Sequence, residues 1–250
     1  MATRSFSTDA PHAQEALAIF QEIDANQDGR LSLEELMGGS ADHGMTEAEI
    51  EQLFTRLDTD GDGTISQEEW VEGYVQLSNE VKLELKRRRL LGLATPEQPI
   101  PSARSCKIEL TEERAVTLGQ LQCLARLAVW VLGECELIDD SKYSATVGRR
   151  IVWDITNMYH LCTHIVMPLT CKPWACSWVE MVAVQAQKPV WFVSQCVPRP
   201  SFGRLGWLSV GVGGSAWSTR LHQTLEMVEW HVEVHQLSGD TPYWICTLAK

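Results

Sequence analysis

The chain has 250 residues, of which 44% are hydrophobic and 22% charged, and its formal net charge is −12. This composition is typical of a folded globular protein and excludes a largely disordered one. Residues 1–80 hold 18 acidic and three basic side chains, net −15, whereas residues 81–250 hold 15 acidic and 18 basic ones, net +3. An acidic first part disfavours nucleic acid as a partner, because phosphates repel it, and suits a cation.

No apolar stretch reaches the roughly 18 residues that a membrane-spanning helix needs, so we expect no transmembrane segment. Residues 1–10 lack the apolar core of a secretory signal, and all eight cysteines lie after residue 105 at irregular spacings. We therefore expect a cytoplasmic protein with reduced thiols.

Four amphipathic helices are expected in residues 10–80, two in each copy of an internal duplication. Each begins at a proline or capping signal, and the starts are expected near Pro11, Ser32, Thr46 and Ser66. The fourth helix has an apolar pattern that predicts its continuation to Leu91.

Each pair of helices is joined by a 12-residue acidic loop, Asp24–Glu35 or Asp58–Glu69, and the two loops are 34 residues apart. Oxygen-bearing residues fill positions 1, 3, 5, 7, 9 and 12, which supply Ca²⁺ ligands, and glycine at position 6 permits a sharp bend. Calcium is a hard ion that prefers six to eight oxygens. The expected metal ligands are Asp24, Asn26, Asp28, Arg30, Ser32 and Glu35 in loop one, and Asp58, Asp60, Asp62, Thr64, Ser66 and Glu69 in loop two.

The two loops differ in ligand charge. Arg30 and Thr64 are expected to offer backbone carbonyls, and Glu35 and Glu69 to bind with both carboxylate oxygens. Loop two has four carboxylates among its ligands, whereas loop one has three and carries the positive Arg30, whose side chain is expected to point outward. Because more negative ligand charge favours tighter binding, we expect the second site to be the tighter one.

Through these loops, residues 10–80 resemble the EF-hand family of calcium-binding proteins. The resemblance implies an all-α lobe of two paired helix–loop–helix units with calcium as the ligand. In such a lobe Leu31 and Ile65, at position 8 of their loops, would hydrogen-bond as a small antiparallel pair.

Residues 81–110 are expected to form a basic helix followed by a proline-containing linker. Val81–Leu93 contains several leucines among five basic side chains, and Pro96, Pro99 and Pro101 follow. An acidic EF-hand groove suits a basic amphipathic helix, either this one or one from another protein. The alternatives are a solvated continuation of the fourth helix, a membrane-surface role and a nuclear-import role.

Residues 111–250 are expected to form an α/β domain with an irregular, Gly-, Ser- and Pro-rich insertion at about 196–222. Its two strands and the helix between them predict a parallel βαβ unit. The expected elements are a helix opening at Thr111 and reaching Val131, a helix over about 145–166 ended near Pro168, a buried strand Val190–Ser194, a helix Thr224–Leu237 and a strand Tyr243–Thr247.

Met158–Val193 and Tyr243–Ala249 loosely resemble an α/β domain of unannotated algal proteins. That resemblance implies a polar, tryptophan-rich motif after the Trp-Phe-Val-Ser strand. Here Gln195-Cys196 leads into the insertion instead, and the chain stops right after the last strand. We therefore leave the activity and the completeness of this domain open.

Zinc is disfavoured at His160, Cys162 and His164, although Cys171 and Cys176 follow. Four residues separate the two cysteines, which is the long end of the usual spacing of zinc ligands, and no second close cysteine pair follows. Buried cysteine is ordinarily a small apolar residue. His231 and His235 repeat the spacing of four residues on a later helix.

Three hypotheses follow from the sequence. The first is a cytosolic calcium sensor that regulates its own C-terminal domain or a protein partner. The second is a calcium-regulated enzyme whose active site lies at the strand ends near Ser194, Cys196 and Thr247. The third is a calcium buffer.

Overall fold

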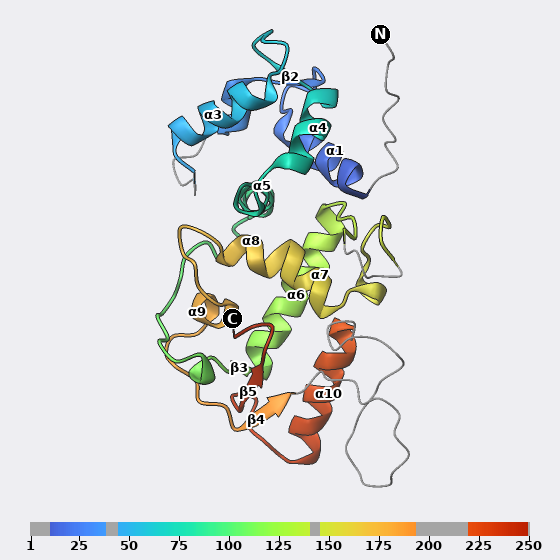
Figure 1. The fold of residues 1–250 in the computed structure, drawn as a ribbon. Coiled ribbons are helices and arrows are strands. Elements are labelled where there is room, and N and C mark those ends of the chain that lie inside the picture. Colours follow the sequence, from blue (N-terminus) through green and yellow to red (C-terminus); the bar gives the residue numbers. More distant parts are fainter. Residues whose placement is uncertain (1–10, 39–44, 141–145, 194–219, 250) are drawn as a thin grey trace, which may run out of the picture. The chain divides into compact units, whose positions relative to one another are not determined.

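The computed structural model describes residues 11–38, 45–140, 146–193 and 220–249 (Figure 1). Its chain divides into two compact units. Unit one comprises residues 1–94, 135–150 and 171–173, and unit two comprises residues 95–134, 151–170 and 174–250.

In unit one, two helix–loop–helix repeats are joined by a short antiparallel pair of strands, β1 (Arg30–Leu31) and β2 (Ile65–Ser66). Leu31 pairs with Ile65, which confirms the predicted contact. At the start of three helices a serine or threonine side chain accepts the backbone N–H of a glutamate at the third helical position. The carboxylate of that glutamate accepts the backbone N–H of the serine or threonine in turn. The helices are α1 (Pro11–Ile23), α2 (Leu33–Met37), α3 (Glu47–Leu57) and α4 (Gln67–Gln76).

The core of unit one lies between α1 and α4, which pack against each other (Figure 1). Trp70 is fully buried beside Phe20, with the two ring centroids 6.3 Å apart. Its indole Nε1 donates a hydrogen bond of 2.7 Å to the carbonyl of Ala16. A buried indole needs such a partner, so this bond fixes the position of α4 on α1.

The prediction that the fourth helix continues to Leu91 is wrong. The chain leaves helical geometry at Leu77, and a new helix, α5 (Asn79–Gly92), begins with Ser78 as its N-cap. The Ser78 hydroxyl accepts the N–H of Val81. A serine that satisfies an otherwise unpaired N–H favours a new start over helix continuation.

Unit two contains a three-stranded sheet and several short helical segments. Its elements are η1 (Thr111–Glu113), β3 (Val116–Thr117), α6 (Leu118–Glu134), η2 (Trp153–Ile155), α7 (Met158–Leu161), η3 (Cys162–Val166), α8 (Met167–Thr170), α9 (Trp178–Val182), β4 (Trp191–Val193), α10 (Leu221–Val234) and β5 (Pro242–Ile245).

The sheet has the order β3-β5-β4, and α10, which lies between β4 and β5 in the chain, packs against α6 (Figure 1). β4 pairs with β5 in parallel, with Phe192 opposite Trp244, which confirms the predicted parallel pair. β3 pairs with β5 antiparallel and has no counterpart in the sequence prediction.

Several expected elements of this region have other bounds. The helix expected from Thr111 begins at Leu118, after a 3-10 turn and a strand. The helix expected over 145–166 begins at Met158 and continues through Pro168 to Thr170. Pro168 stands at the second position of α8, beside a π-helical segment that already interrupts the regular hydrogen-bond pattern.

The first predicted strand is exposed rather than buried: Trp191 is 39% and Phe192 70% accessible. An apolar run can indicate either a buried strand or an exposed strand at the edge of a sheet, and β4 is an exposed edge strand. The later helix is Leu221–Val234 rather than Thr224–Leu237. Ser194, Cys196 and residues 196–219 of the predicted insertion lie outside the described residues.

One buried glutamate, Glu180 on α9, organises a loop of unit two. Its carboxylate accepts the N–H of Ile108 at 3.0 Å and the N–H and hydroxyl of Ser177 at 2.9 and 3.0 Å. Burial would raise the pKa of Glu180, but these hydrogen bonds and the charge of Arg114 outweigh it and lower that pKa. Within the described ranges no helix has the length and apolar character needed to cross a membrane.

Candidate metal centre

The two acidic loops of unit one turn at positive backbone angles. Gly29 and Gly63, at position 6 of the loops, have φ of 80° and 85°, which an L side chain rarely adopts. At position 4 the loops differ, because Gly61 in loop two has φ of 72° and Gln27 in loop one has φ of 58°. Loop one therefore carries a left-handed non-glycine residue where loop two has glycine.

In loop two, carboxylates from positions 1, 3 and 12 converge. One oxygen from each of Asp58, Asp60 and Glu69 lies within 4.8 Å of the others. Calcium binds oxygens at about 2.3–2.6 Å, so ligands on opposite sides of one ion are about 5 Å apart. The spacing of the three carboxylates is thus compatible with a single calcium ion between them.

Glu69 is held by backbone and side-chain donors at both ends of the loop. Its Oε1 accepts the N–H of Thr59 at 2.9 Å and of Asp60 at 3.2 Å, and its Oε2 accepts the N–H of Ser66 at 2.9 Å. Burial would raise the pKa of Glu69, but these donors outweigh it and lower the pKa to about 2. The side chain is therefore ionised and already aimed across the loop.

Loop one repeats this arrangement around Glu35. Its Oε1 accepts the N–H of Asn26 at 3.3 Å, and its Oε2 accepts the N–H of Ser32 at 2.9 Å. Asp24 is buried and accepts the N–H of Gly29 at 2.9 Å. Asn26 stands where loop two has Asp60, which leaves one carboxylate fewer.

The side chain of Arg30, a residue of loop one, contacts loop two. Its guanidinium donates to the carboxylate of Asp62, with which it forms an ion pair, and to the hydroxyl of Thr64 at 2.8 Å. The Thr64 hydroxyl and then Arg30 hold the pKa of Asp62 below its usual value. The prediction from the sequence, that this charge acts on site one and that the side chain points outward, is therefore wrong in its second part. The β1–β2 pairing, which sets Arg30 opposite Ser66, was the signal that could have revealed this contact.

The remaining expected ligands have structural roles as well. Ser32 and Ser66 accept hydrogen bonds as the N-caps of α2 and α4. Asp28 and Asp62 each accept the N–H two residues later at 2.9 Å, which shapes the turn. All twelve expected ligands thus lie on the two loops, six to a loop. Three of the four acidic ligands of loop two, Asp58, Asp60 and Glu69, are brought together in the structure.

The basic helix α5 packs against the helices that carry these loops. Arg88 donates a hydrogen bond of 2.6 Å to the carbonyl of Leu36 at the end of α2, and Arg89 forms an ion pair of 2.7 Å with Glu22 of α1. Lys86 and Arg87 are buried, so the alternative of a solvated continuation of the fourth helix is wrong.

A cavity of about 680 Å³ lies beside loop one, between α5 and the ends of α1 and α2. Both the Glu35 carboxylate of loop one and the Arg88 guanidinium of α5 line this cavity. The residues that line it include Glu22, Ile23, Glu35, Leu36, Leu85 and Arg88.

The other candidate residues lie in different surroundings. His160 and His164 are buried, and the π-helical segment 162–166 interrupts the α-helical geometry that would set them on one face. The Cys162 thiol lies 3.7 Å from the Thr247 carbonyl. Burial raises the pKa of Cys171 and of Cys176 to about 11.

Comparisons with known proteins agree with the geometry of the loops. A family model for an EF-hand domain pair matches residues 13–75. The chain is 38% identical over 65 residues to probable calcium-binding protein CML28 of Arabidopsis thaliana, which covers 26% of this chain and 78% of the relative. It is 41% identical over 54 residues to polcalcin Cyn d 7 of Cynodon dactylon, covering 21% of this chain and 68% of the relative.

A third relative is matched over a smaller share of its length. Probable calcium-binding protein CML25 of Arabidopsis thaliana is 41% identical over 61 residues, covering 24% of this chain and 33% of the relative. No solved structure matches the chain at a significant level.

Proposed function

Because the chain belongs to the EF-hand calcium-binding family, we propose that it binds two calcium ions, at Asp24–Glu35 and Asp58–Glu69, and acts as a calcium sensor. The observation that carries the proposal is the convergence of Asp58, Asp60 and Glu69 within 4.8 Å in loop two. In a sensor, calcium binding must also change the structure elsewhere in the protein, and α5 is the helix whose packing changes. This role includes a cytoplasmic location, which stays a prediction.

Calcium supplies a divalent charge that draws ligand oxygens together, and the residues of each loop decide how readily this happens. In loop two, Glu69 is ionised and spans the loop from position 12 to position 3. Glycine at position 61 takes its positive φ without a Cβ. Four carboxylates and this geometry favour tighter binding at site two, although Arg30 offsets part of the charge.

The route from the ion to α5 is short. Glu35, the last ligand of loop one, lies in the first turn of α2, and the next residue is Leu36, whose carbonyl accepts the Arg88 guanidinium. A shift of Glu35 toward the ion displaces α2 and changes this hydrogen bond. Leu85 of α5 also belongs to the hydrophobic core that contains Trp70. Movement of the loop helices therefore changes the packing of α5.

The charge pattern of unit one also supports α5 as the internal partner of the acidic lobe. Lys86 pairs with Glu15 at 2.6 Å and Arg89 with Glu22 at 2.7 Å, so α5 meets two acidic side chains of α1. A peptide from another protein would have to compete with these contacts. A buffer needs no such helix, because its shape barely changes on binding.

Calcium titration of the full chain tests the binding sites. We expect two sites, with Glu69→Gln and Glu35→Gln each weakening one of them by removing a bidentate carboxylate. Glu68→Gln and Glu34→Gln are matched controls, since these exposed neighbours lie outside the ligand positions. Equal titrations for all four variants and the original chain would contradict the assignment of the loops.

Hydrogen exchange of α5 with and without calcium separates a sensor from a buffer. We expect the amides of residues 79–92 to lose protection when calcium binds, and the loss to be smaller in Glu35→Gln. If calcium binds to both loops while exchange in α5 stays the same, the protein is a buffer.

A further inference from the structure

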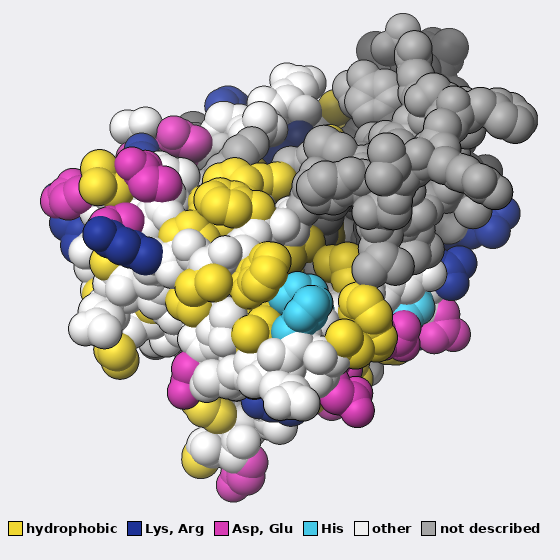
Figure 2. Space-filling view, turned by 90° about the horizontal axis from the view of Figure 1, so that it is seen from below, with side chains coloured by type: hydrophobic (Ala, Val, Ile, Leu, Met, Phe, Trp, Pro, Cys, Tyr) yellow, Lys and Arg dark blue, Asp and Glu magenta, His cyan; other side chains and the backbone are white. Residues whose placement is uncertain are grey.

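Two histidines, His231 and His235, lie side by side near the end of α10 in unit two. They are four residues apart, which sets them on one face of the helix, and their ring centroids are 4.5 Å apart. His231 is half-buried and His235 is exposed. Figure 2 views the molecule from the end where α10 and β4 lie in Figure 1, and it shows histidine among hydrophobic side chains.

The sheet orients the first of these imidazoles. Nδ1 of His231 lies 3.0 Å from the phenol oxygen of Tyr243 on β5, and the Tyr243 side chain is itself buried. When the Nδ1–H donates to this oxygen, Nε2 carries a lone pair. An imidazole that binds a metal through one nitrogen ordinarily donates its other N–H to such a partner.

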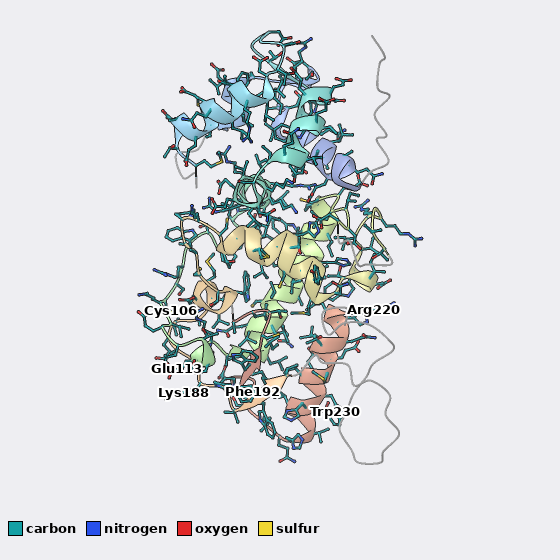
Figure 3. All side chains as sticks on the ribbon, viewed as in Figure 1. Cys106, Glu113, Lys188, Phe192, Arg220 and Trp230 are labelled. Carbon is teal, nitrogen blue, oxygen red and sulfur yellow. The ribbon has the colours of Figure 1, made fainter. Side chains whose placement is uncertain are left out.

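Trp191 of β4 packs against the same pair. Its ring centroid is 4.6 Å from that of His231, edge to face, and 6.0 Å from that of His235. The Trp191 ring therefore closes one side of the histidine pair. Neighbouring exposed aromatics include Phe192 on β4 and Trp230 on α10, both labelled in Figure 3.

We propose that His231 and His235 bind one zinc-like transition-metal ion, with Nε2 of His231 and a ring nitrogen of His235 as the protein ligands. Neutral imidazole suits Zn²⁺, Ni²⁺ and Cu²⁺, whereas Ca²⁺ prefers oxygen, so this site and the acidic loops take different ions. Within the described residues, the pair is not joined by a third histidine, cysteine or carboxylate, so water completes the coordination. The site is independent of the calcium proposal.

Zinc titration of the full chain in saturating calcium tests this site, because calcium then occupies the carboxylate loops. We expect His235→Ala to weaken one zinc site by about tenfold or more, since one of two protein ligands is lost. Tyr243→Phe removes the oxygen that orients His231 and should weaken the same site by roughly tenfold. Thermal unfolding of each variant verifies that it is folded.

His222→Gln is the matched control, because His222 lies on the same helix near Trp153 and away from the pair. It should leave the zinc titration unchanged. Nitrogen NMR of the histidine side chains adds a direct readout: zinc should shift Nε2 of His231 and leave His222 unaffected. The proposal is overturned if His235→Ala binds zinc as the original chain does, or if His222→Gln weakens binding equally.

Discussion

Arg30, the seventh residue of the first calcium loop, forms an ion pair with Asp62, the fifth residue of the second loop. The same guanidinium reaches the hydroxyl of Thr64. A guanidinium of one loop therefore neutralises a candidate ligand of the other. A divalent cation that binds at site two is repelled by this guanidinium, so the two loops influence each other through a side chain as well as through β1 and β2.

Replacement of Arg30 by glutamine should tighten calcium binding at site two. The guanidinium repels the incoming ion and shares the Asp62 carboxylate, so its loss should raise affinity by roughly threefold to tenfold at low salt. Because the pair is exposed, the gain should shrink as ionic strength rises. Calorimetric titration at two salt concentrations measures both effects.

Arg56→Gln is the control for this change, because Arg56 is exposed on α3 and alters the net charge equally. An equal gain in both variants would mean that net charge, and not the contact with Asp62, sets the affinity.

Position 4 adopts a positive φ in both loops, so we expect glycine to be favourable in each. Gly61 has φ of 72° and open space where a Cβ would stand, so Gly61→Ala should cost about 1 kcal/mol of unfolding free energy from backbone strain alone. Gln27 adopts φ of 58°, so Gln27→Gly should be neutral or stabilising by less than about 1 kcal/mol. Urea unfolding compares the pair, and destabilisation by both substitutions would rule out this explanation.

The buried pair of Lys86 and Glu15 makes unit one sensitive to a change in α5. The Nζ–Oε1 distance is 2.6 Å, and the side chains are 10% and 6% exposed. Lys86→Met should destabilise the protein by about 3 kcal/mol or more, because a buried carboxylate loses its cation. Lys172→Met, which breaks the exposed pair with Glu80, should cost less than about 1 kcal/mol. Similar costs in urea unfolding would contradict the difference in burial.

Glu180 should give the stability of unit two a dependence on acid pH. Its pKa is lowered from the usual 4.5 in the folded chain, so its carboxylate stabilises the fold fully above pH 4.5. This contribution is lost as pH falls from 4.5 through the lower folded value. Glu180→Gln should cost about 1–3 kcal/mol at pH 7 and flatten that part of the profile. A parallel profile for the variant would show that other carboxylates are responsible.

The calcium loops could be read from the sequence because their chemistry is local. Ligands at fixed spacings, a glycine at position 6 and capping serines all act within twelve residues. The contact between Arg30 and Asp62 crosses between loops, and spacing along the chain does not reveal it. The β1–β2 register connects them, and Leu31 opposite Ile65 was the available clue.

The helix α5 and the sheet of unit two were harder to predict, because tertiary packing decides both. One helix ends at Leu77 and the next begins at Ser78, within a continuous apolar pattern. Lys86 is buried because Glu15 and Asp140 accept its charge, at 2.6 and 3.5 Å, and those partners are 71 and 54 residues away. Periodicity indicates which face is apolar, but it does not identify a buried ion pair.

Asp140, which contacts Lys86, and Glu136, whose carbonyl accepts Arg89, come from a segment after the proline linker. A fragment cut at the linker would therefore expose one side of α5 and remove a counter-charge. Its calcium affinity would describe an altered lobe rather than the native one. Dissection of this protein has to follow its three-dimensional units, with 135–150 and 171–173 retained, and not the order of its prolines.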